Sequence, residues 1–537
     1  MNADFRYYGM MIDNSRNAVM KPESVKRMID LLEKMGYNSL MLYTEDTYEV
    51  NNQPYFGYLR GRYEKNELKE IDDYADLFGI EVIPCIQTLG HLERYTHWKE
   101  ADSFKDTDRC IIAGCEETLK LIDCMFSNLK DCFRTDKIHV GLDEAWDMGT
   151  GAYLKKYGYV PRVDIFLDHL EKIKKLSLKY GYKLMMWSDM FFRILSPDST
   201  YSADMPDEVL EKYKKSLEGI TPVYWEYHSF DKEKYEKFLN QHKAMCSEFA
   251  FAGGIVNWKG FTSDIYTTKV ASDIALNKCK EHGVKEIYAT IWGDNGGECD
   301  FYFSLYGLSL YAEHMYENDD ILNKAKENFE FITKAKWDAF EVMGGFHHIF
   351  DGREFGHPND KYYGKRLLWQ DILLSNQECF LKENDMVSHY GKLLEKMKEF
   401  SSDEMLWQKR YTYAVALFDF MTLKCEIGTA LYYAYKENNK ALLENITNIK
   451  LDLLYDKLSL LRKLHIELWY DVNKVFGAEV LDTRYSGQLG RIKTAKERLS
   501  MYLSGALEKI EELEEERIPY ATNRGVVYSF IVSPGIM

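Results

Sequence analysis

The chain has 537 residues, which is too long for one ordinary compact domain. Its formal net charge is −17 at pH 7, which excludes nucleic acid as a partner because phosphate binding needs a basic surface. The sequence contains no apolar run long enough for a membrane span, no secretory signal pattern and no C-x-x-C pair among its 10 cysteines. We therefore expect a cytoplasmic protein with free thiols and no membrane contact.

Apolar segments that resemble strands alternate with helical patterns through the first part of the chain. The expected strands cover residues 7–13, 39–43, 80–86, 137–142, 183–187, 220–225, 249–255 and 286–292. Apolar residues recur at helical spacing over about 22–35, 66–78, 113–130, 163–180 and 269–281. Because the strands are mostly apolar rather than alternating, they are typical of a parallel sheet covered by helices.

The repeat count predicts the fold class, which is α/β with a closed (β/α)8 TIM barrel over residues 1–318. A doubly wound open sheet is the alternative, but no G-x-G-x-x-G follows the first strand and no Walker loop is present. Beyond residue 318 the strand signals end and helical periodicity continues to about residue 515. We predict an all-α C-terminal domain over residues 319–537, with a short hairpin or strand at 520–537.

Two adjacent carboxylates, Asp143 and Glu144, follow the fourth expected strand. Alternation along the strand predicts that His139, Gly141 and Asp143 point to one face, and Ile138, Val140 and Leu142 to the other. For an isolated Asp-Glu pair, a solvated strand end is the commoner explanation, since buried carboxylates need partners. A barrel, however, collects the C-terminal ends of all its strands at one rim, and barrel enzymes bind substrate there.

Tryptophans also gather at the predicted rim. Four strands end on or near one, at Trp187, Trp225, Trp258 and Trp292. Indole rings beside carboxylates suit a carbohydrate pocket, because apolar sugar faces stack on rings and hydroxyls bond to Asp and Glu. The rim therefore favours a catalytic interpretation of the carboxylate pair.

Two other interpretations remain open. His91, His139 and His228 could supply metal ligands together with the acids, as in metal-dependent barrel hydrolases, although the usual His-x-His after a first strand is absent. A sugar-binding barrel that has lost catalysis is the second. We expect no metal and no cofactor.

Four motifs together resemble glycoside hydrolase family 20, the β-N-acetylhexosaminidases. Residues 139–144 (HVGLDE) resemble its H-x-G-x-D-E signature, which also lies on the fourth strand. Residues 292–294 (WGD) are similar to its Trp-Gly/Ser-Glu at strand eight, 90–91 (GH) to its Gly-His after strand three, and 13–16 (DNSR) to its Asp-x-Ser-Arg after strand one. The resemblance covers the barrel, roughly residues 5–318.

The resemblance implies an exo-acting, retaining enzyme that releases terminal β-linked GlcNAc, or GalNAc, from a glycan or glycoconjugate. The substrate's own 2-acetamido oxygen would attack the anomeric carbon and form an oxazolinium ion. Glu144 would be the general acid and then the base, and Asp143 would hold the acetamido N–H. The implied substrate-binding residues are Arg16, Asp46, His91, His139, Trp187, Trp225, Tyr227, Trp258, Trp292 and Asp294.

The chain departs from the family pattern at two positions. Tyr8 stands where the family has an Arg that grips O3 and O4 of the sugar, and Arg16 is the residue that could compensate. Asp294 replaces the usual Glu, which shortens its reach by one methylene. The choice between GlcNAc and GalNAc is therefore open. Separately, the helical half could form a homodimer, which the sequence does not decide.

Overall fold

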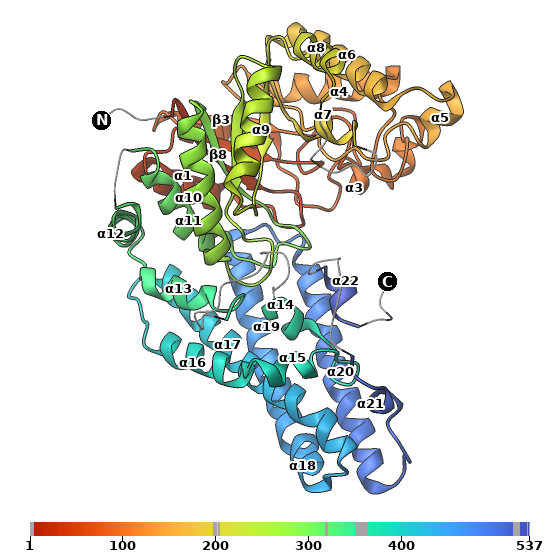
Figure 1. Ribbon diagram of the computed structural model, residues 1–537, viewed down its shortest axis with the longest axis vertical. Helices are drawn as coiled ribbons and strands as arrows, with labels where there is room; N and C mark the ends of the chain where they lie inside the picture. Colours follow the sequence, from red (N-terminus) through yellow and green to blue (C-terminus); the bar gives the residue numbers. More distant parts are fainter. Residues whose placement is uncertain are drawn as a thin grey trace. The chain divides into compact units, whose positions relative to one another are not determined.

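The computed structural model describes residues 5–196, 201, 205–316, 320–349, 363–518, 527–533 and 535. The chain divides into two compact units (Figure 1). The first contains Met1–Ile255, Thr268–Gly293 and Gly307–Asn328, and the second contains Val256–Thr267, Asp294–Tyr306 and Phe329–Met537. Among the described residues, no helix has the length and apolar character that crossing a membrane requires.

The first unit is a closed barrel of eight parallel strands, which confirms the predicted fold class. Their order around the barrel is the order along the chain, and β1 closes the barrel by pairing with both β2 and β8. The strands are β1 Tyr7–Asp13, β2 Ser39–Tyr43, β3 Glu81–Cys85, β4 Lys137–His139, β5 Lys183–Trp187, β6 Ile220–Trp225, β7 Ala250–Gly254 and β8 Glu286–Ile291.

The longer helices that follow the strands bury an apolar stripe, as α1, Pro22–Lys34, and α4, Glu116–Lys130, show. In α1 the side chains of Val25, Met28 and Leu32 are fully buried, and each contributes about 1.5–3 kcal/mol of burial free energy. The other helices of this part of the chain are α2 Lys65–Asp76, α3 Glu93–Thr96, η1 Lys99–Ser103, α4 Glu116–Lys130, α5 Ala152–Tyr157, α6 Arg162–Tyr180, α7 Asp189–Arg193, α8 Asp207–Ser216, α9 Lys232–Met245, α10 Ile265–Glu281, η2 Phe301–Ser304 and α11 Leu305–Glu313.

The C-terminal region is helical in its described part, as predicted. The helix α17, Met405–Lys436, packs against α16 and α19, and α19 runs beside α20 (Figure 1). The helices are α12 Ile321–Thr333, α13 Trp337–Gly344, α14 Tyr363–Trp369, α15 Glu378–Glu383, α16 Met386–Lys398, α17, α18 Lys440–Asn445, the π-helical η4 Ile446–Lys450, α19 Leu451–Val472, α20 Ala478–Ser504, α21 Glu511–Glu514 and α22 Tyr528–Ile531.

The hairpin or strand predicted for the tail is wrong for its described part, which contains the short helix α22. Residues 519–526, 534 and 536–537 lie outside the described residues. Ile531 and Val532 are buried, and the Val532 carbonyl accepts a hydrogen bond of 2.9 Å from the Asp371 N–H. Tertiary packing therefore overrides the β propensity of this valine-rich and aromatic-rich segment.

The fourth strand is shorter than predicted. It ends at His139, and Gly141 and Leu142 both have a left-handed backbone with φ of 71°. A Cβ at Gly141 would lie 2.2 Å from the Gln87 side-chain oxygen and 2.7 Å from the Ile86 carbonyl oxygen. The chain turns here because only glycine fits so close to the end of β3, and the strand alternation that we expected through Asp143 stops at His139.

We expect Gly141→Ala to destabilise the barrel by at least about 2–3 kcal/mol, because it combines a left-handed backbone with a steric clash. Gly158→Ala is the matched control, since Gly158 also has a positive φ, 75°, but no atom within 4 Å of an added Cβ. Its cost should be only about 1 kcal/mol. Urea unfolding followed by tryptophan fluorescence compares the two variants, and equal losses would contradict the clash.

Candidate active site

The ends of β1 and β8 are joined by Asp13. One carboxylate oxygen accepts hydrogen bonds from the Ser15 N–H at 2.9 Å and the Ser15 hydroxyl at 2.7 Å. The other accepts from the Gly293 N–H at 2.9 Å. Asp13 therefore fixes the start of the loop that carries Arg16 and the position of Trp292 at the end of the eighth strand.

Arg16 lies at the barrel rim, between a carboxylate and two rings. Its guanidinium is 3.1 Å from Glu45 Oε1 and lies over the rings of Tyr43, at 4.9 Å, and Trp292, at 5.0 Å. Burial raises the pKa of Glu45 to about 7, although the positive charges of Arg16 and His91 oppose the rise. The side chain of Arg16 is 20% exposed, so a substrate hydroxyl can still reach it.

Asp143 is held by two side chains from the segment that follows β3. Its Oδ1 accepts a hydrogen bond of 2.8 Å from the Gln87 amide, and its Oδ2 is 3.2 Å from His91 Nε2. Burial favours the protonated acid, but His91 and the hydrogen bonds from His91 and Gln87 outweigh it and lower the pKa of Asp143 to about 2. Burial opposes the charge on His91 as well, yet Asp143 and Glu45 raise its pKa to about 9. The two groups therefore form an ion pair at neutral pH.

Glu144 turns toward the same imidazole as Asp143. Its backbone is left-handed, with φ of 46°, and its Oε2 is 3.7 Å from His91 Nε2. The Glu144 N–H donates a hydrogen bond of 3.2 Å to Asp189 Oδ2. The Glu144 side chain is 30% exposed, against 10% for that of Asp143. In an extended strand two neighbouring side chains would point apart, whereas here both carboxylates share one site and Glu144 is the more accessible.

An aromatic wall continues from these carboxylates. Trp187 and Trp292 have ring centres 6.0 Å apart, Tyr227 is 6.3 Å from Trp292, and Trp225 stacks on Tyr227 at 5.1 Å with 18° between the planes. Three of the four predicted tryptophans thus gather with Tyr227 at the rim. The Tyr227 phenol lies within electrostatic range of Asp143, and burial raises the pKa of Tyr227 well above its ordinary value, so the hydroxyl keeps its proton.

His139 lies beneath this wall rather than in it. Its side chain is fully buried, its ring is 4.4 Å from that of Trp187, and its Nδ1 accepts a hydrogen bond of 3.2 Å from the Gly141 N–H. Burial lowers the pKa of His139 to about 3, so the ring is neutral. His139 therefore supports the turn before Asp143 and the position of Trp187. This role needs no direct contact between His139 and a sugar.

Asp46 is buried at the start of the loop after β2. The Arg60 Nε donates a hydrogen bond of 3.0 Å to its Oδ1, and a second guanidinium nitrogen bonds to the Ser15 carbonyl. The second oxygen, Oδ2, has no hydrogen-bond partner among the described residues. Asp46 therefore joins two rim loops and keeps one acceptor unused.

Two predicted substrate residues belong to the second unit. Trp258 is 8% exposed, and Asp294 is exposed. Within that unit the Asp294 carboxylate opposes the effect of burial on the ammonium groups of Lys259 and Lys365, whose pKa values burial lowers. Asp294 is thus an acid that faces two lysines.

Tyr8 lies outside the site. Its ring packs against that of Tyr37 at 5.2 Å, and its hydroxyl donates a hydrogen bond to the Tyr311 carbonyl. This tyrosine belongs to the layer between the barrel and its helices. The cation that lies near Trp292 is Arg16.

Five residues that contact the predicted site are absent from the set that the sequence predicts. Asp189 and Arg193 had a usable signal, since their spacing of four directly after a strand is that of one helical face. Glu45 and Gln87 follow strands two and three, but nothing in the sequence distinguished them from other rim residues, and Arg60 lies far along its loop. The five are Glu45, Arg60, Gln87, Asp189 and Arg193.

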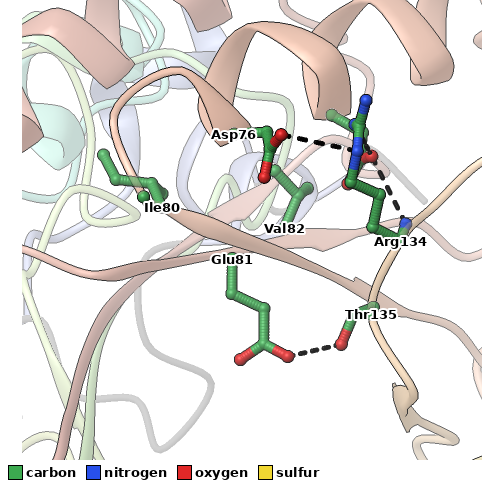
Figure 2. A pocket seen from close by; sticks show the side chains of 8 residues that line it. Asp76, Ile80, Glu81, Val82, Arg134 and Thr135 are labelled. Atoms are coloured by element: carbon green, nitrogen blue, oxygen red, sulfur yellow. Dashed lines mark hydrogen bonds and ion pairs between the residues drawn. The ribbon is translucent and has the colours of Figure 1, made fainter.

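A surface cavity of about 280 Å³ lies at the other ends of the strands, where β3 begins and β4 is about to begin. Figure 2 shows Arg134 reaching toward Asp76, at 3.6 Å, while the Thr135 hydroxyl donates to Glu81 at 2.5 Å. These contacts connect α2 to the two strands. Because barrel enzymes work at the C-terminal ends of their strands, we assign this cavity no part in the chemistry. Among the described residues, no group of three or more His, Cys, Asp or Glu side chains has the arrangement of a metal site.

Two family models match the chain, and both describe a glycoside hydrolase. The model described as "Glycosyl hydrolase family 20, catalytic domain" matches residues 5–205, and "Glycoside Hydrolase 20C C-terminal domain" matches residues 338–532. The chain belongs to glycoside hydrolase family 20.

Curated relatives match about half of this chain at 26% identity. Hexosaminidase D from Bos taurus is 26% identical over 255 residues, which are 44% of this chain and 68% of the relative. Hexosaminidase D from Homo sapiens is 26% identical over 265 residues, 46% of this chain and 50% of the relative. The chain thus spans half to about two thirds of their length. A solved β-N-acetylhexosaminidase from Bacteroides fragilis NCTC 9343 has a TM-score of 0.47 at 17% identity and covers 62% of this chain and 70% of that one.

The His91–Asp143 ion pair predicts a pH-dependent stability. The pKa of His91 is about 9 in the folded chain against 6.5 for an ordinary histidine, so its protonation stabilises the fold fully below pH 6.5 and this contribution is lost as the pH rises through 9. Between pH 7.5 and 9.5 we expect the difference in unfolding free energy between wild type and His91→Gln to shrink by about 1–3 kcal/mol. Urea titrations at several pH values measure this difference.

His169→Gln is the control for that experiment. His169 is also buried, but burial lowers its pKa to about 4, so its ring stays neutral throughout the tested range. The stability difference between wild type and this variant should therefore not change between pH 7.5 and 9.5. Parallel behaviour of the two variants would mean that His91 is not charged in the folded chain.

Proposed function

We propose that the chain is an exo-acting, retaining β-N-acetylhexosaminidase that removes terminal β-linked GlcNAc, or GalNAc, from glycans by substrate-assisted catalysis. The observation that carries the proposal is the approach of both Asp143 and Glu144 to one nitrogen of His91, at 3.2 and 3.7 Å. Neighbouring carboxylates on the same side of the chain can act on adjacent atoms of one sugar. Family membership and the names of the curated relatives support the same reaction.

Asp143 has the electrostatics of an acetamido clamp. With a pKa of about 2 it is ionised at neutral pH, and it can accept the acetamido N–H of a bound sugar. That hydrogen bond turns the acetamido oxygen toward the anomeric carbon. When the oxygen attacks and the oxazolinium ion forms, the negative charge of Asp143 stabilises the new positive charge.

Glu144 has the exposure that proton transfer to a leaving group requires. In the first step its proton passes to the glycosidic oxygen as the bond from that oxygen to the anomeric carbon breaks and the acetamido oxygen bonds to the same carbon. In the second step a water oxygen bonds to the anomeric carbon while the water gives a proton to Glu144. The bond from that carbon to the acetamido oxygen breaks at the same time, so the acetamido group is restored. Two displacements at one carbon retain the β configuration.

The remaining predicted residues would recognise the sugar. We propose that the Tyr227 hydroxyl, which keeps its proton, donates to the acetamido oxygen, while Trp187, Trp225 and Trp292 surround the acetamido group and the ring. Arg16 and Asp46 would bind hydroxyls at the rim. Asp294 and Trp258 follow the eighth and seventh strands along the chain and stay predicted substrate residues.

Glu144→Gln and Asp143→Asn separate the two roles by their dependence on the leaving group. We expect Glu144→Gln to reduce kcat/KM for 4-methylumbelliferyl β-GlcNAc by about 10²–10⁴-fold, and much less for a dinitrophenyl glycoside, which needs no acid. Asp143→Asn should lose a similar factor with both substrates, because attack by the acetamido oxygen is impaired in each case. Initial rates on the two substrates give these ratios.

Asp207→Asn and Glu208→Gln are the matched controls, since they form an exposed Asp-Glu pair at the start of α8. Both should keep wild-type rates. Turnover by Glu144→Gln at the wild-type rate on the methylumbelliferyl substrate would exclude this carboxyl as the acid.

A thiazoline analogue of GlcNAc tests participation of the acetamido group directly. We expect competitive inhibition by the thiazoline, and hydrolysis of aryl β-GlcNAc or β-GalNAc but not of aryl β-glucoside, which has no acetamido group. Exhaustive chelation should leave the rate unchanged. Loss of activity on chelation with recovery on adding a metal would instead support a metal-dependent hydrolase.

We also propose that the enzyme works in the reducing cytoplasm. All ten cysteines lie among the described residues and are free thiols, and six of them are buried. Free buried thiols are typical of proteins in a reducing compartment.

A further inference from the structure

We infer that Asp189 and Arg193 are positioning residues for Glu144 and that together they set the pH range in which Glu144 donates its proton. The inference rests on the proposed function, because it assigns the pair to the acid–base carboxyl. Nothing in the family motifs includes either residue.

The pair is built on one short helix. The helix α7 begins directly after β5 and Ser188, and its first and last residues, Asp189 and Arg193, are four apart and therefore share a face. Arg193 Nε donates to Asp189 Oδ2 at 2.9 Å, with side chains that are 12% and 0% exposed. The start of the helix is fixed in turn, since the Ser188 hydroxyl bonds to the Val223 carbonyl at 3.1 Å and lies 2.8 Å from His242 Nε2.

The pair contacts Glu144 at two points. Asp189 Oδ2, which accepts from Arg193, also accepts the Glu144 N–H at 3.2 Å. Arg193 Nη2 is 4.0 Å from Glu144 Oε1. The first contact holds the left-handed backbone that turns Glu144 toward the site, and the second places a positive charge beside the carboxyl that must exchange a proton.

Three rings surround the guanidinium of Arg193. Its central carbon lies 4.6 Å from the ring centre of Trp146, 5.2 Å from that of Tyr201 and 5.6 Å from that of Trp225. Rings at this distance attract a cation and exclude water from it. The positive charge is therefore fixed in place and poorly screened, which makes its effect on Glu144 larger than that of a surface arginine.

The charges that face Glu144 nearly balance. Asp143 and Asp189 are acidic, while His91 and Arg193 are cationic. Burial and the negative charge of Asp143 raise the pKa of Asp189 to about 7 although Arg193 opposes the rise, so the charge on Asp189 depends on its arginine. Removal of one member of the pair therefore leaves an imbalance whose sign depends on which member is lost.

Arg193→Gln and Asp189→Asn should shift the alkaline limb of the pH profile of kcat/KM in opposite directions. Without the arginine cation Glu144 keeps its proton more readily, so the limb should move up by about one pH unit. Without the aspartate anion the arginine cation still favours ionised Glu144 and no neighbouring anion opposes it from Asp189, so the limb should move down by about one unit. Initial rates on an aryl β-GlcNAc from pH 4 to 10 measure both shifts.

Arg193→Lys tests whether charge alone suffices. It should restore the pH of the alkaline limb, because the positive charge is kept. The rate should stay lower, because the single nitrogen of lysine cannot bond to Asp189 and approach Glu144 at once. Asp168→Asn and Lys172→Gln are the matched controls, since they form a pair of the same spacing on α6, at 2.7 Å, that is largely exposed. Neither control should change the rate or the limb.

Two outcomes overturn different claims. If Glu144→Gln abolishes turnover but the limb stays at its wild-type pH in both Arg193→Gln and Asp189→Asn, or moves the same way in both, the pair is only structural and this inference fails. If Glu144→Gln retains turnover, the proposed function fails instead.

Discussion

The site depends on the ion pair between His91 and Asp143. The imidazole fixes one carboxylate at 3.2 Å and approaches the next at 3.7 Å, so it organises two neighbouring residues at once. Its own charge is supported from the other side by Glu45, 3.9 Å from Nδ1. An isolated buried charge would be expensive, and this arrangement keeps each charge opposite another.

Residues of this ion pair and beside it have a left-handed backbone conformation, which non-glycine residues rarely adopt. His91, Leu142 and Glu144 are non-glycine residues with φ of 53°, 71° and 46°, and each costs about 1–2 kcal/mol relative to an ordinary conformation. They lie in the two segments that meet at the site. A Cβ at Gly90 would come within 3.1 Å of the Asp143 carbonyl oxygen, so these segments are in close contact. The barrel strands hold these two segments together, and their left-handed backbone directs both carboxylates toward His91.

The cations around the carboxylates have different tasks in this scheme. His91 keeps Asp143 ionised, whereas Arg16 pairs with Glu45 and lies on Trp292, where it can meet a sugar hydroxyl. Arg193 pairs with Asp189 and stands beside Glu144. In the proposed mechanism the negative charge of Asp143 stabilises an oxazolinium ion and also discourages ionisation of Glu144. The placement of these cations would then determine which carboxyl carries the proton.

The sequence by itself determined the barrel, because eight apolar segments separated by amphipathic helices leave few other ways to bury both faces of a parallel sheet. Its motif also singled out Asp143 and Glu144. Only the tertiary structure decided how they face each other, since a strand pattern cannot reveal the left-handed turn after His139 that close contact with Gln87 imposes. It likewise decided that Tyr8 packs away from the site and that Asp189 and Arg193 support Glu144. These contacts join residues that are far apart in the sequence, so the pattern of a single strand or helix does not reveal them.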